Sequence, residues 1–225
     1  MKNNKGDDIM KFKAVIFDLD GTLLDTLGDI AISTNAALKN RGYAEHDVSK
    51  YRGFVGDGMD MLARRVLPGD IDDESVILEF IKEVKEEYTN GWKNTSDLYP
   101  GIKNMLNMLK ERGIKKSVLS NKPHDFTVAH VEYFLSHWDF EVVSGVKKGI
   151  PRKPDPSGAI EISKAMSIAP KEFIYVGDTK TDMKTAVGAG MFPVGVLWGF
   201  RDEDELRENG AKEIIKRPED LLDFI

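Results

Sequence analysis

Short apolar runs alternate with longer amphipathic stretches along most of the chain. The first run, Ala14–Phe17, is β-branched and aromatic and is soon followed by a glycine, which is typical of a buried strand. Further runs of this kind lie at 115–119, 140–143, 173–176 and 193–197, with a shorter one at 211–214. Helical patterns separate most of them, so the sequence predicts an α/β fold with a parallel sheet.

The pattern differs between the first and second predicted strands. From Thr26 to Trp92 it is mostly helical, with apolar residues at helical spacing in 29–41 and 71–88. A single crossover helix does not need so many residues. We therefore expect a core domain formed by 1–25 and 99–225, and a second, all-helical domain formed by 26–98 that is placed over the crevice of the sheet.

Composition narrows the class of protein. The 225 residues carry a formal net charge of −6 and no long basic tract, which gives no support for nucleic-acid binding. No apolar run approaches the ~20 residues of a membrane span, and residues 1–10 are polar and read as a loose tail. There is no cysteine, which excludes disulfides, thiolate metal sites and a cysteine nucleophile. A cytoplasmic location is expected.

Two acids follow the first predicted strand. Asp18 and Asp20 are two positions apart, so in an extended chain their side chains face the same site. Two close carboxylates are costly to ionise together unless a cation lies between them, and Mg²⁺ is the usual oxygen-bound cation beside phosphate. Gly21 allows a sharp turn and Thr22 adds a hydroxyl group. A plain strand-to-turn junction also contains Asp and Gly, so the string alone leaves both interpretations open.

Polar residues also follow three later strands. Ser120 and Asn121 precede a helix, where they either bind an anion or cap the helix. Lys153 stands in a stiff, proline-rich basic loop, as a positioned cation or as part of a solvated surface. Asp178 and Asp182 stand at a strand end and in the first turn of the next helix, as metal ligands or as partners of the helix dipole.

Two further segments have two interpretations each. The glycine-rich segment around Val55, Gly56, Asp57 and Gly58 is either a turn between helices or a loop that faces the substrate. Trp198 and Phe200 belong either to an interface or to the core, with the core favoured.

The strand-end residues match a known set in type and in order. Asp18-x-Asp20-Gly21-Thr22, Ser120-Asn121-Lys122, Lys153-Pro154-Asp155 and Gly177-Asp178-x-x-x-Asp182 resemble the four motifs of the haloacid dehalogenase-like hydrolases. The resemblance covers the chain from Lys13 onward and implies a Rossmann-like sheet of strand order 3-2-1-4-5, with a sixth strand optional. The helical segment resembles the cap of the subgroup that contains phosphoglycolate phosphatase and β-phosphoglucomutase, and Ser-Asn-Lys-Pro with Val55–Gly58 resembles the former branch most.

The resemblance also implies roles for these residues. Asp18 would attack phosphorus and Asp20 would protonate the leaving oxygen and later activate water. Mg²⁺ would be bound by Asp18, the main-chain carbonyl of Asp20 and Asp178, while Asp182 would orient the water ligands of the metal. Phosphoryl oxygens would be bound by Ser120, Asn121 and Thr22, with Lys153 neutralising charge. We expect a helical cap hinged near 24–26 and 99–101 that closes over a small phosphorylated metabolite.

Several alternatives stay open at this point. A dehalogenase is disfavoured because that branch lacks an aspartate at the position of Asp20. A phosphomutase and an inorganic pyrophosphatase share the same core. A phospho-accepting receiver module is disfavoured because receivers are shorter and carry no helical cap. The sequence does not choose between a monomer and a homodimer.

Overall fold

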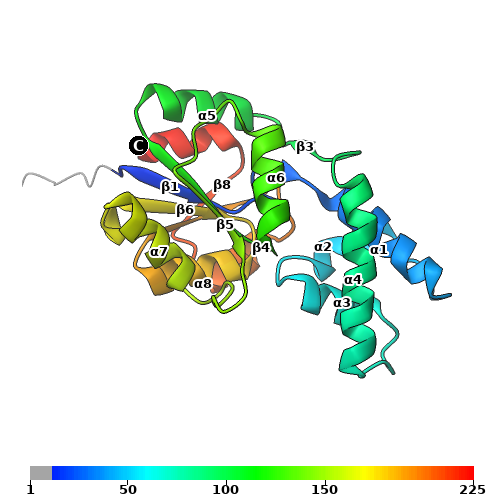
Figure 1. Cartoon of the computed structure of the whole chain (residues 1–225). Helices are drawn as coiled ribbons and strands as arrows, with labels where there is room; N and C mark the ends of the chain where they lie inside the picture. Colours follow the sequence, from blue (N-terminus) through cyan, green and yellow to red (C-terminus); the bar gives the residue numbers. More distant parts are fainter. Residues whose placement is uncertain (1–11) are drawn as a thin grey trace, which may run out of the picture.

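The computed structural model describes residues 12–225 and contains a parallel sheet with helices on both faces (Figure 1). The strands pair in the order β5-β4-β1-β6-β7-β8, and every pair is parallel. They are β1 (Ala14–Phe17), β4 (Lys115–Pro123), β5 (Val142–Val146), β6 (Phe173–Gly177), β7 (Phe192–Val196) and β8 (Glu213–Ile215). Counted along the chain this is the order 3-2-1-4-5-6, so the predicted fold class and strand order are confirmed. The expected tail, 1–10, lies outside the described residues.

Alternation along β1 explains the two covered faces. Val15 and Phe17 belong to one apolar cluster, and Ala14 and Ile16 belong to another on the opposite face. The first face is covered by α5 (Ile102–Glu111), α6 (His124–Phe134) and the 3₁₀ helix η3 (Pro218–Phe224), and the second by α7 (Ser157–Met166) and α8 (Lys180–Ala189). Figure 1 shows α5 above the sheet and α7 and α8 below it. Two short helices, η2 (Pro170–Glu172) and α9 (Glu203–Glu208), complete this part of the chain.

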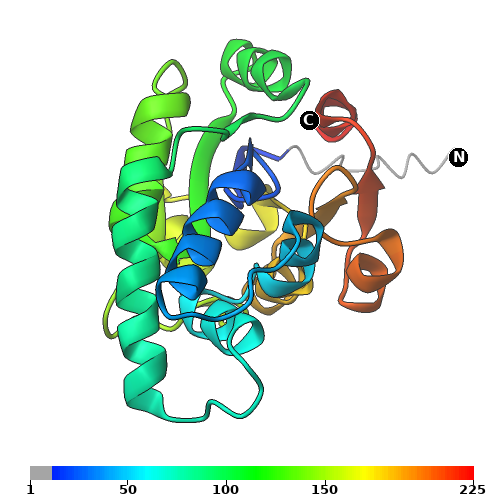
Figure 2. The same ribbon diagram turned by 90° about the vertical axis from the view of Figure 1, so that its right-hand side faces the viewer.

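The helices between β1 and β4 form a separate packed group, which we call the helical region (residues 27–91). It consists of α1 (Leu27–Asn40), η1 (Val48–Lys50), α2 (Tyr51–Phe54), α3 (Met59–Val66) and α4 (Glu74–Gly91). These helices bury their own apolar cluster, which includes Leu38, Tyr51 and Phe80. Figure 2 shows α1 and α4 side by side in front of the sheet.

Two chain segments connect the helical region to the sheet, and they are tied to each other. The two-residue strands β2 (Leu24–Asp25) and β3 (Asp97–Leu98) pair antiparallel. The Asp29 carboxylate accepts hydrogen bonds from the backbone N–H and hydroxyl groups of both Thr95 and Ser96 at 2.7–3.1 Å. Both connections lie at or beside the expected hinges, and hinge motion stays a prediction.

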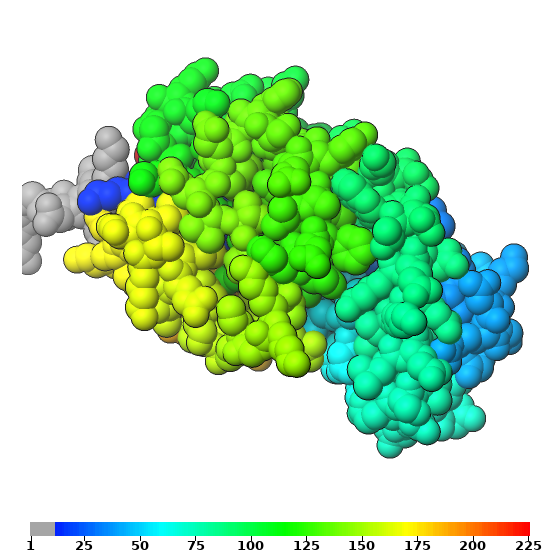
Figure 3. Space-filling view, viewed as in Figure 1, coloured from blue at the N-terminus to red at the C-terminus, as the bar shows by residue number. Residues whose placement is uncertain are grey.

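The helical region also contacts the sheet side along α4 and α6, which lie side by side in the space-filling view (Figure 3). The Tyr88 hydroxyl lies 3.0 Å from Nε2 of His130. The ring of Trp92 packs on the same imidazole, with ring centroids 4.5 Å apart. In the part of the chain that is described, no helix is long and apolar enough to cross a membrane.

Some predicted boundaries were wrong. Strand β4 continues to Pro123 instead of ending at residue 119, because it keeps pairing with β5 as far as Val146. Strand β5 begins at Val142 rather than at residue 140. Helix α4 starts three residues later than expected, where the Asp73 side chain caps it by accepting the N–H of Ser75.

Candidate active site

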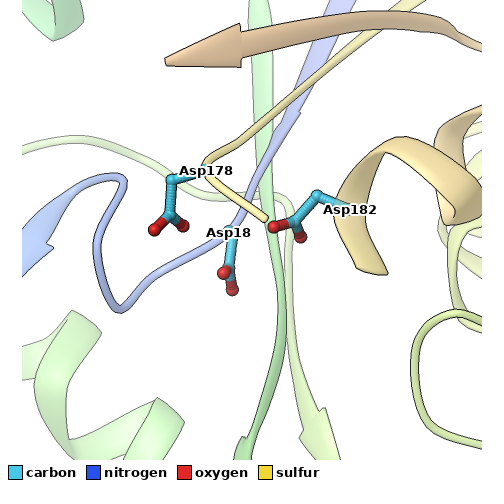
Figure 4. Close-up of side chains that lie close together, drawn as sticks. All are labelled: Asp18, Asp178 and Asp182. Atoms are coloured by element: carbon cyan, nitrogen blue, oxygen red, sulfur yellow. The ribbon is translucent and has the colours of Figure 1, made fainter. Parts of the chain in front are cut away.

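Three carboxylates from three places in the sequence meet at the carboxyl ends of β1 and β6. Asp18 directly follows β1, Asp178 directly follows β6, and Asp182 lies in the first turn of α8. One oxygen from each lies within 4.8 Å of the others, and all three residues are buried (Figure 4). Neighbouring parallel strands end at the same edge of a sheet, which explains why residues 160 positions apart in the chain converge here.

Lys153 supplies the positive charge of this cluster. It lies in the loop between β5 and α7 and is 4% exposed. Its Nζ is 2.8 Å from Oδ1 of Asp18 and 2.7 Å from Oδ1 of Asp182, and it donates to the Leu119 carbonyl at 3.0 Å. The expected positioned cation is thus buried between two acids, whereas a solvated loop would leave it in water.

The oxygens of Asp182 are already bonded within the protein. Besides Lys153, Asp182 accepts the backbone N–H of Thr179 at 3.0 Å and its hydroxyl at 2.6 Å. The Tyr175 hydroxyl reaches the other oxygen at 3.4 Å. These contacts favour a supporting role for Asp182 over direct binding of a metal.

Asp178 is held from both sides of its carboxylate. The Thr22 hydroxyl donates to Oδ1 at 3.1 Å, and the backbone N–H of Phe200 donates to Oδ2 at 2.8 Å. Thr22, expected to bind phosphate, therefore directs its hydroxyl to Asp178 in this structure. Trp198 supports the same turn by donating its indole N–H to the Thr22 carbonyl at 2.9 Å.

Asp20 lies apart from the three-carboxylate cluster and has its own cation. Lys122 Nζ lies 3.0 Å and 3.1 Å from its two oxygens, and the Thr26 hydroxyl donates to it at 2.7 Å. Burial opposes ionisation of Asp20, but Lys122, His130 and Thr26 together lower the pKa of this carboxyl below its ordinary value. Lys122 also lies over the ring of Tyr88, 4.7 Å from its centroid.

Close backbone packing leaves no room for side chains beside Asp178. Gly21 has φ of +84°, and a Cβ there would lie 2.4 Å from Oδ2 of Asp178. A Cβ on Gly199 would lie 2.3 Å from Cβ of Asp178. The glycines therefore allow two turns of the chain to pack directly around the acid.

The charges of the cluster point to a bound cation. Burial raises the pKa of Asp18 to about 7, and the nearby Asp182 adds to the rise while Lys153 opposes it. Burial raises the pKa of Asp178 well above its ordinary value, with Asp18 and Asp182 adding to the rise. Lys153 alone thus leaves the acids under-compensated, and oxygen ligands of this kind fit a hard divalent cation.

The family comparison agrees with the site. The model of the haloacid dehalogenase-like hydrolase family matches residues 15–196. This chain belongs to the haloacid dehalogenase-like hydrolases. A phosphoglycolate phosphatase of Nitrosospira multiformis is 31% identical over 213 residues, covering 92% of each chain. One of Psychrobacter arcticus is 28% identical over 222 residues, covering 96% of each.

Solved structures are also similar to this hydrolase. A crystal structure from Lactobacillus delbrueckii subsp. bulgaricus, provisionally named a phosphoglycolate phosphatase, superposes with a TM-score of 0.88 at 28% identity. The match covers 94% of this chain and 97% of that one. The family match and the shared name of the relatives support an enzyme that hydrolyses phosphomonoesters.

A pocket of this hydrolase opens between the strand ends and the helical region. Asp18, Asp20, Ser120 and Asn121 line it on the sheet side. The helical region contributes mainly apolar side chains and loop backbone: Ile30, Val55, Gly56, Gly58, Met59, Leu62, Val84 and Tyr88. Of the expected substrate loop, three residues thus line the pocket, while Asp57 forms an ion pair with Arg65.

Asn121 links the two walls of the pocket. Its Nδ2 donates to the Gly56 carbonyl at 3.1 Å and to the Lys153 carbonyl at 3.0 Å, and its buried Oδ1 has no hydrogen-bond partner among the described residues. The Ser120 hydroxyl accepts the N–H of Lys122 at 3.2 Å. Both residues therefore lie where a ligand of the pocket can reach them.

Sequence reasoning missed two residues of the site. The sequence places Lys122 only within the motif Ser120-Asn121-Lys122 and predicts no role for it, although it is the cation nearest to Asp20. Phe200 was expected in the core, and its side chain does pack in the apolar cluster of the helical region, but its N–H also binds Asp178. For Lys122 the available signal was its position directly after a Ser-Asn pair that follows a predicted strand. For Phe200 there was none, because a backbone N–H donor leaves no signal in the sequence.

Proposed function

We propose that this hydrolase is a Mg²⁺-dependent phosphatase that acts on a small phosphomonoester, with phosphoglycolate as the first candidate, through an aspartyl-phosphate on Asp18. The observation that carries the proposal is the position of Asp18. It lies in the pocket with its carboxylate beside Lys153 and Asp178, and Asp20 lies two residues further along the chain. The names of the relatives supply the candidate substrate.

In the first step an Asp18 oxygen attacks phosphorus, and the bond from phosphorus to the leaving oxygen breaks. Asp20 gives its proton to that oxygen. In the second step Asp20 takes a proton from water as the water attacks phosphorus, and the bond to Asp18 breaks. The helical region acts as a cap that closes over the pocket and limits access of water during the first step.

The charges around Asp20 fit this sequence of protonation. In the free enzyme Lys122 holds the pKa of Asp20 low, so this carboxyl is ionised. A phosphoryl group in the pocket competes for Lys122, since both Lys122 and Ser120 line it. Losing that contact raises the pKa of Asp20, so that it takes up one proton from solvent as substrate binds; this is the proton that it gives to the leaving oxygen.

Asp18, Asp178 and the main-chain carbonyl of Asp20 are the groups that would hold Mg²⁺. The cation would offset negative charge between the carboxylate and the phosphoryl group. Asp182 keeps Lys153 and the first turn of α8 in place. Ser120, the N–H of Asn121 and Lys153 bind phosphoryl oxygens or offset their charge, and Thr22 assists by orienting Asp178.

The test is turnover of phosphoglycolate, pyrophosphate, sugar phosphates and nucleoside monophosphates by metal-stripped enzyme with and without Mg²⁺. We expect kcat/KM for phosphoglycolate to exceed the others by at least about tenfold, a difference of about 1.4 kcal/mol. Asp18→Asn should abolish turnover, and acid quenching of the wild type should trap phosphate on the peptide that contains Asp18. Activity of Asp18→Asn above a few per cent of wild type would contradict the nucleophile. A preference for another substrate would contradict only the candidate.

A further inference from the structure

The Trp198–Arg201 segment follows β7 and connects the sheet to the helical region. The guanidinium of Arg201 donates to two main-chain carbonyls of that region, those of Arg52 and Val55, the second at 2.9 Å. The Arg201 side chain is only 14% exposed, and Glu205 lies 3.3 Å from its Nε. Arginine suits this position because its fixed planar group presents several donors at once.

Further contacts hold the segment that carries these two carbonyls, residues 52–58. Arg52 donates from Nη1 to the Gly199 carbonyl at 3.2 Å, so the contact between loop and segment is reciprocal. Asn121 donates to the Gly56 carbonyl from the opposite side. Three carbonyls of residues 52–56 are therefore bonded to side chains of the sheet domain. Because they are backbone groups, the contacts do not depend on which side chains the loop carries.

The held loop is also a wall of the catalytic pocket. Val55, Gly56 and Gly58 line the pocket opposite Asp18 and Asp20. Gly56 has φ of +112° and Gly58 has φ of +89°, conformations that favour glycine. The backbone of the loop is thus shaped to approach the strand ends closely, and a force that holds it there also sets the size of the pocket.

The same segment reaches the acid cluster. Phe200 is 7% exposed and packs in the apolar cluster of the helical region, while its backbone N–H binds Asp178 at 2.8 Å. Movement of the helical region away from the sheet would therefore pull on the residue that orients Asp178. Arg201, the next residue, is the polar anchor of this connection.

We propose that Arg201 is a positioning residue that holds segment 52–58, the end of α2 and the loop after it, over the strand ends in the substrate-free enzyme, so that the Trp198–Arg201 segment couples closure of the helical region to the orientation of Asp178. The proposal concerns the pocket of the proposed phosphatase and in that respect rests on that function. In physical terms, the proposal concerns the fraction of molecules in which the helical region is closed over the pocket. If the binding-competent closed form is only partly populated, apparent affinity falls by the populated fraction. Removing the anchor lowers that fraction without removing any group that touches the reacting atoms.

The first experiment is amide hydrogen exchange of the metal-free, substrate-free protein. Arg201→Met should raise exchange of residues 52–58 by about tenfold, since local opening reports the loss of the contacts that held the loop. Arg207→Met is the matched control: Arg207 is a half-exposed arginine of α9 whose ion pair, at 2.7 Å, is with Glu203 of the same helix. Its exchange pattern should equal that of the wild type. Unchanged exchange in Arg201→Met overturns the proposal.

Kinetics separate positioning from simple loss of structure. For the preferred phosphomonoester, Arg201→Met should raise KM by about tenfold with kcat within about twofold, because saturating substrate restores closure. A lower kcat at unchanged KM indicates a smaller fraction of folded enzyme and overturns the proposal. Arg201→Lys, which keeps the charge but offers a single donor group, should fall between the wild type and Arg201→Met in both measurements.

The two proposals fail in distinguishable ways. The exchange experiment needs neither metal nor substrate, so its outcome stands even if no phosphomonoester is turned over. Conversely, a working phosphatase whose loop exchanges equally in Arg201→Met and the wild type leaves the proposed function intact and removes the role of Arg201. If Arg201→Met is recovered unfolded, Arg201→Lys carries the same comparison.

Discussion

At the scale of single residues, Lys153 is the cation that two acids of the site share. Three oxygens, from Asp18, Asp182 and the Leu119 carbonyl, lie within 3.0 Å of its Nζ. Its hydrogen bonds go to Asp182 and the Leu119 carbonyl, while Oδ1 of Asp18 is an ion-pair partner that accepts no hydrogen bond from the described residues. Lys153 therefore acts as a fixed charge, whose value depends on its partners staying in place.

We predict that Lys153→Met lowers kcat by about 10²–10³-fold, because one donor to the developing charge is lost. It should also lower the free energy of unfolding by about 3–5 kcal/mol, since two buried acids lose their partner. Denaturant titration and steady-state kinetics measure the two effects.

Lys116 is the matched control for that variant. It is also 4% exposed, but its Nζ makes one long contact, 3.4 Å, to the Ile114 carbonyl. Burial lowers its pKa, so its charged form destabilises the folded state. Lys116→Met should leave activity unchanged and stability within about 1 kcal/mol of wild type or above it. Equal losses in both variants would show that burial of any lysine, rather than its acid partners, decides the effect.

The residues that could be predicted from the sequence share one property: they follow an apolar strand. Asp18 and Asp178 directly follow β1 and β6, Asp20 lies two residues beyond Asp18, and Ser120 lies inside β4 just after the apolar run 115–119. Parallel strands end at one edge of the sheet. The pairing of Lys122 with Asp20 is not predicted by the sequence, because the apolar pattern ends β4 at residue 119, four residues before its observed end at Pro123. Which lysine pairs with which aspartate depends on the residue at which each strand ends. Predicting these ion pairs therefore needs strand ends that are accurate to one or two residues.

At the scale of elements, the turn from β1 toward β2 (residues 18–23) shows how backbone shape creates the site. Gly21 lies in the left-handed region and packs directly against Asp178 and Phe200. Conformation and space both demand glycine there, and the two demands can be separated by experiment.

We predict that Gly21→Ala lowers the free energy of unfolding by about 1–3 kcal/mol and strongly reduces turnover, since the new Cβ would displace the Asp178 carboxylate. Gly42→Ala is the control. Its φ is +75°, but no atom of residues 12–225 lies within 4 Å of its added Cβ, so it measures the conformational strain alone, about 1 kcal/mol. Turnover of Gly42→Ala should equal that of the wild type. If Gly21→Ala retains full turnover, contact with Asp178 does not matter for catalysis.

Elements with strong local patterns were predicted well, and those set by tertiary contacts were not. Strands β1, β6 and β7 are apolar runs that the sequence marks clearly. The two-residue strands β2 and β3 have no such pattern, because their pairing follows from bringing together residues 72 and 74 positions apart. Strand β5 is half-buried and lies at the edge of the sheet, so its pattern is weak and its predicted start was two residues early.

At the scale of the whole molecule, the pocket lies between two separately packed bodies. The helical region has its own apolar cluster. The two chain segments that connect it to the sheet are tied to each other by the β2–β3 pair and by the hydrogen bonds to Asp29. Separate cores joined by narrow connections favour relative motion. The polar and apolar contacts across the pocket then decide how often it is closed.

The acid cluster also makes global stability depend on pH and on metal. Burial raises the pKa of Asp18 from an ordinary 3.8 to about 7, so between these values the folded protein holds a proton that the unfolded chain releases. The free energy of unfolding of the metal-free protein should therefore fall as pH rises from 4 to 7, by about 1.4 kcal/mol per pH unit for each such proton. Asp20, whose pKa is lowered, adds no slope in this window.

The titration of His130 changes the free energy of unfolding in the opposite direction. Its contribution is separated from that of Asp18 by comparing two proteins. Burial lowers its pKa to about 4, so its contribution to stability rises with pH between 4 and 6.5. Asp18→Asn keeps His130 and deletes the raised carboxyl. The difference in free energy of unfolding between wild type and Asp18→Asn, measured without metal, removes the contribution of His130. It reports the proton on Asp18 together with the effect of Asp18 on Asp178, whose pKa it also raises. We expect this difference to fall with pH across the window.

Mg²⁺ should reverse the trend in the wild type. The cation binds carboxylates in their ionised form, so its affinity and the stabilisation it gives both increase with pH. We predict that the rise in Tm on adding Mg²⁺ is larger at pH 8 than at pH 5, and that Asp18→Asn shows a smaller rise with little dependence on pH. Calorimetry of both proteins at the two pH values measures this directly. An identical response of wild type and Asp18→Asn would show that the metal binds away from Asp18. The positive charge that offsets the buried acids would then have to come from another group.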